Sequence, residues 1–523
     1  MGARRPEGRV PETRQTGMFL DCPLEVPVSK TTGTARFQDR DPRDIFVGAE
    51  RLDSYLARTG SGWVVKLRQQ LEEVDFSALT KVYQDRGRWP FHPRVMVGLV
   101  VYGILLKQWS LRDLEGLAAR DVGAWFICGG HQPDHSTVGK FLELHRETLS
   151  DEFFASLTRR LVMRLGTQGK VAAIDGTVIE AASSRFRLLK AEAARQAARE
   201  AVAAAEERPE DEVLATKAMQ AQTVAEMVTA REQKQKEKGK KSTASIVPAE
   251  PEAVMQPRKD GVMRPAYKPS VLVSGGLILA QQVDPISETT VFPALLEQAT
   301  SVSGQAIETA LADAGYWSLT VLQVAVDRNL NLLCPSGQTR EDDWDKAGPA
   351  GLFAKNRFAF NEKTNAYLCP AGQTLVPIEA GIEHGIPYQR YATKVCNECP
   401  IKGQCTKGVR RTVKRYEGDE LKDAMQAVLA QPAARAAYRR RQAMVEPTFA
   451  ELRERQGLHR FHRRGIRGAK LEFSLHCMAL NLKRTVAGVC AQLSLIFLWS
   501  HRSGTPRLVL AAVSLSIEPA NRV

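Results

Sequence analysis

The 523-residue sequence lacks any apolar run long enough to cross a membrane. A transmembrane helix needs about 20 consecutive apolar residues. The best candidates, residues 95–106 and 489–499, are much shorter and predict buried core helices. Residues 1–5 lead into polar sequence, so no secretory signal is expected. These absences predict a cytoplasmic protein without membrane contact.

Cysteine is also scarce, with nine in the chain, but four of them are concentrated within residues 369–405. Without an export signal, this clustering favours metal binding or free thiols over disulfides. Four thiolates suit a tetrahedral Zn²⁺ site. An iron–sulfur cluster would need the same number of ligands, although the spacing matches neither common ferredoxin pattern. We therefore predict one structural Zn²⁺ site, with unligated thiols as the alternative, formed by Cys369, Cys396, Cys399 and Cys405.

Acidic residues are outnumbered, because 59 Asp and Glu face 73 Lys and Arg, which gives a net charge of +14. Such an excess indicates a polyanionic partner, of which nucleic acid is the most common. A general solubility charge would be spread evenly along the chain. Instead, residues 435–470 contain eleven Lys and Arg against three acids. We expect this segment to contact nucleic acid.

The pattern of apolar and turn-forming residues predicts an α/β core that is interrupted by an insertion and preceded by an all-α domain. Strands are expected at residues 170–174 and 306–312, and a hairpin is expected at Gly275-Gly276. The predicted order is a tail (1–36), a helical domain (37–167), the first part of the core (168–334, with a helical insert at 185–241), a cysteine-rich insertion (335–430), the last part of the core (431–490) and a second tail (491–523).

Three acidic motifs mark the candidate site. Asp175 and Asp313 each follow a predicted strand, and Glu446 lies in the basic segment. A strand-terminal aspartate is usually part of a simple turn. Carboxylates that meet at adjacent strand ends, however, can hold Mg²⁺ ions through their oxygens. A pair of such ions can cut and rejoin phosphodiesters.

The two aspartate motifs resemble those of bacterial insertion-sequence transposases of the DDE type, which share the ribonuclease H-like fold. The sequence Ala-Ile-Asp-Gly-Thr-Val-Ile-Glu-Ala at residues 173–181 is similar to the first motif of that family, and Ala-Asp-Ala-Gly-Tyr at residues 312–316 matches the second residue for residue. The resemblance extends over roughly residues 37–490. It includes residues 91–94 and 128–137 in the helical domain and residues 457–465 after the glutamate.

The third motif of the family is a Tyr, two residues, an Arg, three residues, a Glu, six residues and a Lys. Tyr438 and Arg441 keep the first spacing, whereas four residues separate Arg441 from Glu446, and Arg453 takes the place of the Lys. Pro447 disfavours a helical conformation at the residue before it, so Glu446 is expected to start a helix or lie at a kink. Glu180, Asp284 and Glu288 are expected to cap or face solvent, and assistance at the site is the alternative.

The resemblance implies metal-dependent cleavage at transposon ends and transfer of the 3′-hydroxyl ends into target DNA. It implies that Asp175, Asp313 and Glu446 are catalytic and bind two Mg²⁺ or Mn²⁺ ions. It also implies a homodimer on double-stranded DNA, both terminal inverted repeats and target. One branch of the family carries a similar cysteine-bearing insertion. The alternatives are a ribonuclease H-fold nuclease without strand transfer and an inactive DNA-binding relic.

Arginine can bind phosphates by bidentate contacts, which fix the position of a protein on DNA without reading its sequence. Recognition of the repeats is therefore assigned to the helical domain around residues 93–146, for which a structural or dimer-forming bundle is the alternative. A solvated surface is the alternative for each of the residues that we expect to contact DNA, which are Tyr438, Arg441, Arg453, Arg460, Arg463 and Arg464.

Overall fold

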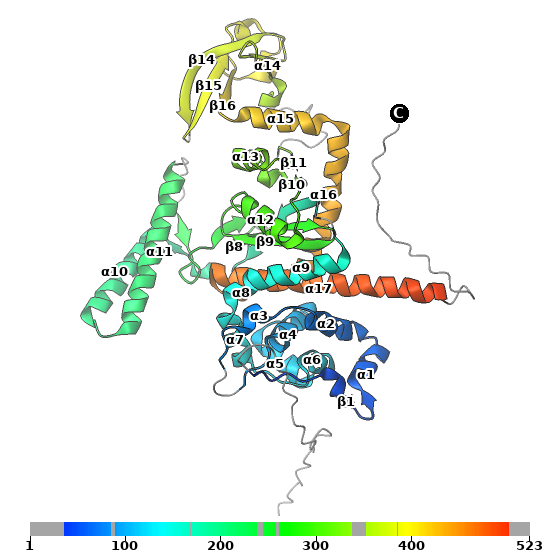
Figure 1. Ribbon diagram of the computed structural model, residues 1–523. Coiled ribbons are helices and arrows are strands. Elements are labelled where there is room, and N and C mark those ends of the chain that lie inside the picture. Colours follow the sequence, from blue (N-terminus) through cyan, green and yellow to red (C-terminus); the bar gives the residue numbers. More distant parts are fainter. Residues whose placement is uncertain are drawn as a thin grey trace, which may run out of the picture.

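The computed structural model describes residues 36–84, 89–167, 169–237, 244–257, 261–336, 352–383 and 385–500. A group of N-terminal helices lies on one side of the long helix α17 (Gly465–Ser500), and a mixed sheet lies on the other (Figure 1). Two further parts, a helical arm and a second sheet, extend from this body (Figure 1). Among the described residues, no helix is both long and apolar enough to span a membrane.

The N-terminal region is helical, as predicted, with one short β-ribbon of β1 (Phe46–Val47) and β2 (Glu50–Arg51). Local sequence fixes several helix starts. Ser110 and Asp113 form a reciprocal capping box, and Asp134 accepts a hydrogen bond from the Thr137 amide. The helices are α1 (Leu52–Arg58), α2 (Gly62–Glu72), α3 (Ser77–Thr80), α4 (Pro93–Leu105), α5 (Leu111–Arg120), α6 (Val122–Cys128), α7 (His135–Leu144), α8 (Arg146–Ser150) and α9 (Glu152–Leu165).

The central sheet combines parallel and antiparallel strands in the order β11-β10-β3-β8-β9. Strand β10 runs parallel to both β3 and β11, while β8 runs antiparallel to β3 and β9. Two short strands extend the sheet along the first half of β8. The strands are β3 (Val171–Gly176), β4 (Ile179–Glu180), β7 (Val254–Pro257), β8 (Met263–Ser274), β9 (Leu277–Asp284), β10 (Thr309–Ala312) and β11 (Asn331–Leu333).

The predicted hairpin between β8 and β9 is confirmed. Gly275 and Gly276 both have positive φ angles, of 55° and 79°, which glycine adopts readily and which a two-residue turn of this kind requires. The predicted helices after β9 and after Asp313 are also present, as α12 (Phe292–Ser303) and α13 (Leu319–Asp327). Helix α12 joins the antiparallel half of the sheet to the parallel half, and α13 joins the parallel strands β10 and β11.

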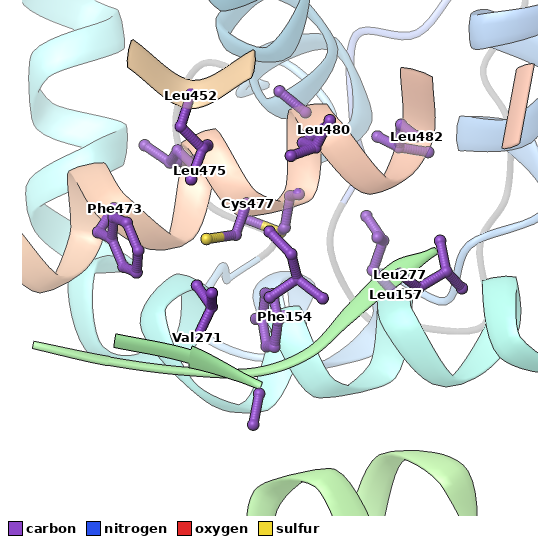
Figure 2. Packing of buried hydrophobic residues seen from close by; sticks show 14 of the residues in the cluster. Phe154, Leu157, Val271, Leu277, Leu452, Phe473, Leu475, Cys477, Leu480 and Leu482 are labelled. Atoms are coloured by element: carbon purple, nitrogen blue, oxygen red, sulfur yellow. The ribbon is translucent and has the colours of Figure 1, made fainter. Parts of the chain in front are cut away.

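Helix α17 connects the helical region to the sheet through one continuous hydrophobic core. Its buried side chains pack between α9 and the β8–β9 hairpin (Figure 2). Asn481 is fully buried and bonds to both the amide and the carbonyl of Ile278, at 2.9 Å each, which fixes α17 to the sheet edge. The labelled members of this core are Phe154, Leu157, Val271, Leu277, Leu452, Phe473, Leu475, Cys477, Leu480 and Leu482.

The predicted helical insert is a two-helix arm between β3 and β8. It consists of α10 (Ala191–Glu207) and α11 (Glu212–Glu237), with a small ribbon of β5 (Leu189–Lys190) and β6 (Ser245–Ile246) at its base. The arm extends away from the central sheet (Figure 1). It has a small core of its own, formed by Ala191, Ala194, Val224, Val228, Ala244 and Ile246.

The cysteine-bearing insertion forms an antiparallel sheet around a small aromatic core. Helices α15 (Asp419–Ala430) and α16 (Pro432–Ala450) then lead back to the central sheet (Figure 1). The strands are β12 (Ala359–Asn361), β13 (Ala366–Leu368), β14 (Thr374–Glu383), β15 (Ile386–Ala392) and β16 (Thr412–Tyr416), and a short helix, α14 (Lys402–Cys405), lies before β16.

Candidate active site

Asp175 and Asp313 meet at one edge of the central sheet. Strands β3 and β10 are parallel, with Ile174 opposite Ala312, so the two aspartates occupy the next position on neighbouring strands. Each side chain is oriented by a local amide, because Asp175 accepts from Gly176 at 2.9 Å and Asp313 accepts from Gly315 at 3.0 Å. The structure therefore brings together two of the three predicted carboxylates.

Arg441 of α16 supplies the positive charge between them. Its Nη2 lies 3.0 Å from Oδ2 of Asp175 and 3.9 Å from Oδ2 of Asp313. All three side chains are largely withdrawn from solvent at this edge, with Asp313 the most exposed at 37%. Both carboxylates thus face a single cationic group. The contact between Arg441 and DNA stays a prediction.

Burial shapes the titration of this site. Burial raises the pKa of Asp175 to about 6, Arg441 opposes that rise, and the charges of Asp313 and Glu288 add to it. Tyr438 lies one turn before Arg441 on α16, and burial raises the pKa of its phenol to about 12. The buried Cys334 thiol donates to the Asp313 carbonyl at 3.1 Å. A cation beside Asp175 therefore favours the charged form of that carboxyl.

The donor atoms at this edge suit a hard divalent cation, because carboxylate oxygens are preferred ligands of Mg²⁺ and Mn²⁺. The position of the Arg441 guanidinium between the carboxylates shows that one cation can contact both. Within the described ranges, no group of three or more His, Cys, Asp or Glu side chains forms a ready metal site. The two aspartate carboxylates fit a metal ion chemically. Further protein ligands would reach the ion only if a side chain or a helix moved.

Glu446 is not brought to the aspartates. It is exposed on α16, where its Oε1 accepts from Gln442 at 2.8 Å. It lies five positions after Arg441, which places it about 140° around the helix axis. The prediction that Glu446 could start a helix is wrong, since Pro447 lies inside α16, which continues to Ala450. Burial of Val445, Thr448 and Phe449 holds this turn despite the missing proline amide.

Two of the predicted DNA-binding arginines also have structural partners. Arg460 donates from Nε to the Ala181 carbonyl at 3.1 Å and from its guanidinium to the Ala182 carbonyl. Arg463 is half-buried beside Glu472, which accepts from its backbone amide at 2.9 Å. These contacts fasten the segment after α16 to the chain that follows β4 and to α17, whereas Arg464 is exposed.

The four predicted zinc ligands line one pocket beside the second sheet, although within the described residues no group of three or more Cys side chains forms a ready metal site. All four thiols are half-buried and free of disulfides, and they line one pocket. Burial raises the pKa of Cys405, the nearby Arg411 lowers it, and the other three thiolates raise it. The pocket is thus the place where Cys369, Cys396, Cys399 and Cys405 converge.

The structure confirms one of the expected supporting roles of the remaining acids. Asp284 caps the turn after β9 by accepting from the amides of Ile286 and Ser287. Glu180 pairs with Arg264 at 2.6 Å. Glu288, in contrast, is half-buried beside Asp175 and Asp313. The sequence favours a capping or surface role for Glu288, with assistance at the site as the alternative, and its half-buried place beside the aspartates agrees with the alternative.

Asp175→Asn is expected to be more stable than the wild type at pH 7, by up to about 3 kcal/mol in the free energy of unfolding. The folded-state pKa of about 6 lies above the ordinary 3.8, so the folded protein loses stability as the pH rises between those values. Asparagine does not titrate. Thermal unfolding in EDTA should therefore show a smaller difference in stability between Asp175→Asn and the wild type at pH 4.5 than at pH 7. An equal difference at both pH values would contradict the assigned pKa.

Comparison with known families agrees with these features. A model described as a transposase DDE domain matches residues 368–486, which include Tyr438, Arg441 and Glu446. A model described as a transposase domain (DUF772) matches residues 63–144 in the helical region. Asp175 and Asp313 lie outside both matched segments. No curated protein matches the chain.

A transposase DDE domain implies an enzyme of the nuclease and transposase class, and such enzymes act on DNA and generally use divalent metal ions. The two models match in the order that the sequence predicts, first the helical region and then the segment with the glutamate. Together the matches support a DDE transposase of the insertion-sequence type with an N-terminal transposase domain.

Proposed function

We propose that this chain cleaves DNA at transposon ends and joins the freed 3′-hydroxyls to target DNA. The observation that carries the proposal is the meeting of Asp175 and Asp313 at adjacent parallel strand ends, with one cation against both. The mixed strand order β9-β8-β3-β10-β11 supports a ribonuclease H-like core. The transposase matches support the reaction class.

The proposed reaction consists of two phosphoryl transfers. In the first, water attacks the phosphorus at the transposon end, the P–O3′ bond breaks, and the end is left with a 3′-hydroxyl. In the second, that hydroxyl attacks a target phosphorus and displaces a target 3′-oxygen, so the number of phosphodiesters is unchanged. Two divalent ions, when bound, would activate the attacking oxygen and stabilise the leaving one.

In this proposal, Asp175, Asp313 and Glu446 hold the metal ions. Arg441 and Glu446 lie on the same helix, and movement of α16 and its side chains would exchange the guanidinium for a carboxylate. Arg441 would then be free to bind a phosphate near the scissile bond. The guanidinium balances the negative charge of the two aspartates.

The rest of the DNA surface is proposed from the basic segment. Tyr438, Arg453 and Arg464 would contact the backbone beside the site, while Arg460 and Arg463 would also hold their segment in place. Phosphate contacts of this kind make binding weaken steeply with salt. Recognition of the inverted repeats is proposed for the helical region, and a homodimer would pair two transposon ends.

The test uses labelled end DNA taken from the inverted repeats that flank the gene, with a target plasmid and Mg²⁺ or Mn²⁺. The proposal predicts both cleaved ends and joined products, and neither product should form in EDTA. Cleavage without joining would favour a nuclease. Binding without cleavage in either metal would overturn the enzymatic proposal and favour an inactive DNA-binding relic.

For the second sheet, we propose one structural Zn²⁺ held by the four clustered thiolates. The purified protein should contain about one equivalent of zinc, and Cys396→Ser should lose it together with thermal stability. Cys477→Ser is the matched control, because that thiol is buried in the central core and lies far from the pocket in the sequence. Less than one equivalent, unchanged by Cys396→Ser, would rule the site out. Iron and sulfide in its place would indicate a cluster.

A further inference from the structure

A cavity of about 570 Å³ lies between the helical region and the basic segment that follows α16. Residues 109–112, at the start of α5, line it from one side, and residues 462–464 line it from the other. Apolar side chains of α4 and α17, among them Ile104, Leu471 and Leu475, complete its wall. The two regions thus build the cavity jointly.

The two sides of the cavity are fixed to each other. The imidazole ring of His462 stacks on the indole ring of Trp109, with ring centroids 4.9 Å apart and an angle of 12° between the planes. Glu472 of α17 is buried, and it accepts from the Trp109 indole at 3.3 Å. The same carboxylate accepts from the amides of His462 and Arg463 at 2.9 Å each. The cavity is therefore held in shape by stacking and hydrogen bonds.

Three arginines line the cavity with guanidinium groups that have no hydrogen bond or ion pair to any residue that the structure describes. They are Arg112, Arg463 and Arg464. Arg463 is half-buried, and burial lowers the pKa of its guanidinium, while the charges of Glu472 and Glu143 raise it. A charge that is withdrawn from water is costly unless an opposite charge reaches it. The Arg463 guanidinium therefore favours an anion in the cavity.

The two acids that line the cavity do not neutralise these arginines. Glu143 pairs instead with Arg146, at 3.0 Å. Glu472 accepts from three donors, and burial raises the pKa of its carboxyl to about 7, so it carries only part of a negative charge at neutral pH. The three arginines thus leave the cavity positively charged.

We propose that this cavity binds a phosphate of the DNA backbone, with Arg112 of the helical region acting together with Arg463 and Arg464 of the basic segment. The inference rests on the proposed action of the chain on DNA. Guanidinium groups bind phosphate through bidentate, charge-assisted hydrogen bonds. Arg112 and Arg464 are exposed, so an extended strand can reach both from solvent, and the net charge of +14 favours a polyanion over a free anion. The contact would hold the helical region and the core on one DNA molecule.

The test measures binding of fluorescently labelled transposon-end DNA to the full chain in EDTA, from fluorescence anisotropy at several salt concentrations. Arg112→Ala is expected to weaken binding by about tenfold, because it removes one charge-assisted contact. It should also reduce the slope of log affinity against log salt concentration by about one. Arg112 is exposed on α5, so its replacement should leave the fold intact, which thermal unfolding checks.

Arg120→Ala is the control, because Arg120 is exposed at the other end of the same helix and lies outside the cavity. It removes the same charge and should leave the affinity and the salt slope unchanged. If Arg112→Ala binds DNA like the wild type, or if both variants weaken binding equally, the cavity is not a DNA site and the proposed function stands. If inorganic phosphate stabilises the wild type but not Arg112→Ala, while both bind DNA equally, the cavity holds a free anion instead. If the wild type binds no DNA, the proposed function itself fails.

Discussion

Asp313→Asn is expected to reduce cleavage of transposon-end DNA by about 10³-fold or more. A metal ion at the reacting phosphate contributes several kcal/mol to transition-state stabilisation, and each 1.4 kcal/mol corresponds to a factor of ten in rate. Asp313 is one of the two acids that meet at the strand ends. Asparagine can still accept from the Gly315 amide, so the local turn should be preserved.

The cleavage rate of Asp313→Asn is best measured beside Asp327→Asn. Asp327 lies at the end of α13, is exposed and accepts from Gln323, so it tests the effect of removing a nearby acid outside the site. The control should cleave at the wild-type rate. Full activity of Asp313→Asn, with wild-type DNA binding, would remove Asp313 from the catalytic set.

Arg441→Ala is expected to lose about 3 kcal/mol of stability in EDTA at pH 7.5, and added Mn²⁺ should restore most of it. Removing one partner of a buried ion pair leaves an uncompensated charge, which is strongly destabilising. Here it would leave Asp175 and Asp313 without their shared cation. A bound divalent ion would replace that charge and stabilise the folded state by mass action.

Two comparisons separate this effect from a packing defect. Arg441→Lys keeps a positive charge and should retain more stability than Arg441→Ala. Lowering the pH below about 6 should also reduce the loss, since Asp175 then takes up a proton and no longer needs the cation. A loss that is independent of both pH and Mn²⁺ would indicate that Arg441 contributes packing only.

The parts of the fold that depend on local sequence were predictable. Short apolar runs that end at Asp175 and Asp313 became β3 and β10, and the Gly275-Gly276 pair became the hairpin between β8 and β9. In each case the chain's own turn chemistry fixes the structure. The second sheet was not visible, because its core consists of a few aromatic side chains such as Tyr367 and Tyr391 on short strands.

The candidate site was only partly predictable for a related reason. The position of Glu446 depends on which side of α16 faces the core. Val445 is buried on that side, so the next residue, Glu446, is exposed and points away from Arg441. Proline is disfavoured in a helix, yet tertiary packing keeps Pro447 inside α16. The place of Glu288 near Asp175 and Asp313 depends on how three distant segments meet. Such contacts are fixed by tertiary structure and leave no periodic trace in sequence.

The central claim is that Asp175 and Asp313 together hold divalent metal. Anomalous X-ray diffraction from crystals soaked in Mn²⁺ tests it most directly, because the signal locates the ion without reference to activity. We expect an anomalous peak about 2.2 Å from a carboxylate oxygen of each aspartate, with Arg441 displaced from its present place between them. Full Mn²⁺ occupancy elsewhere on the chain, with Arg441 still between the aspartates, would contradict the claim.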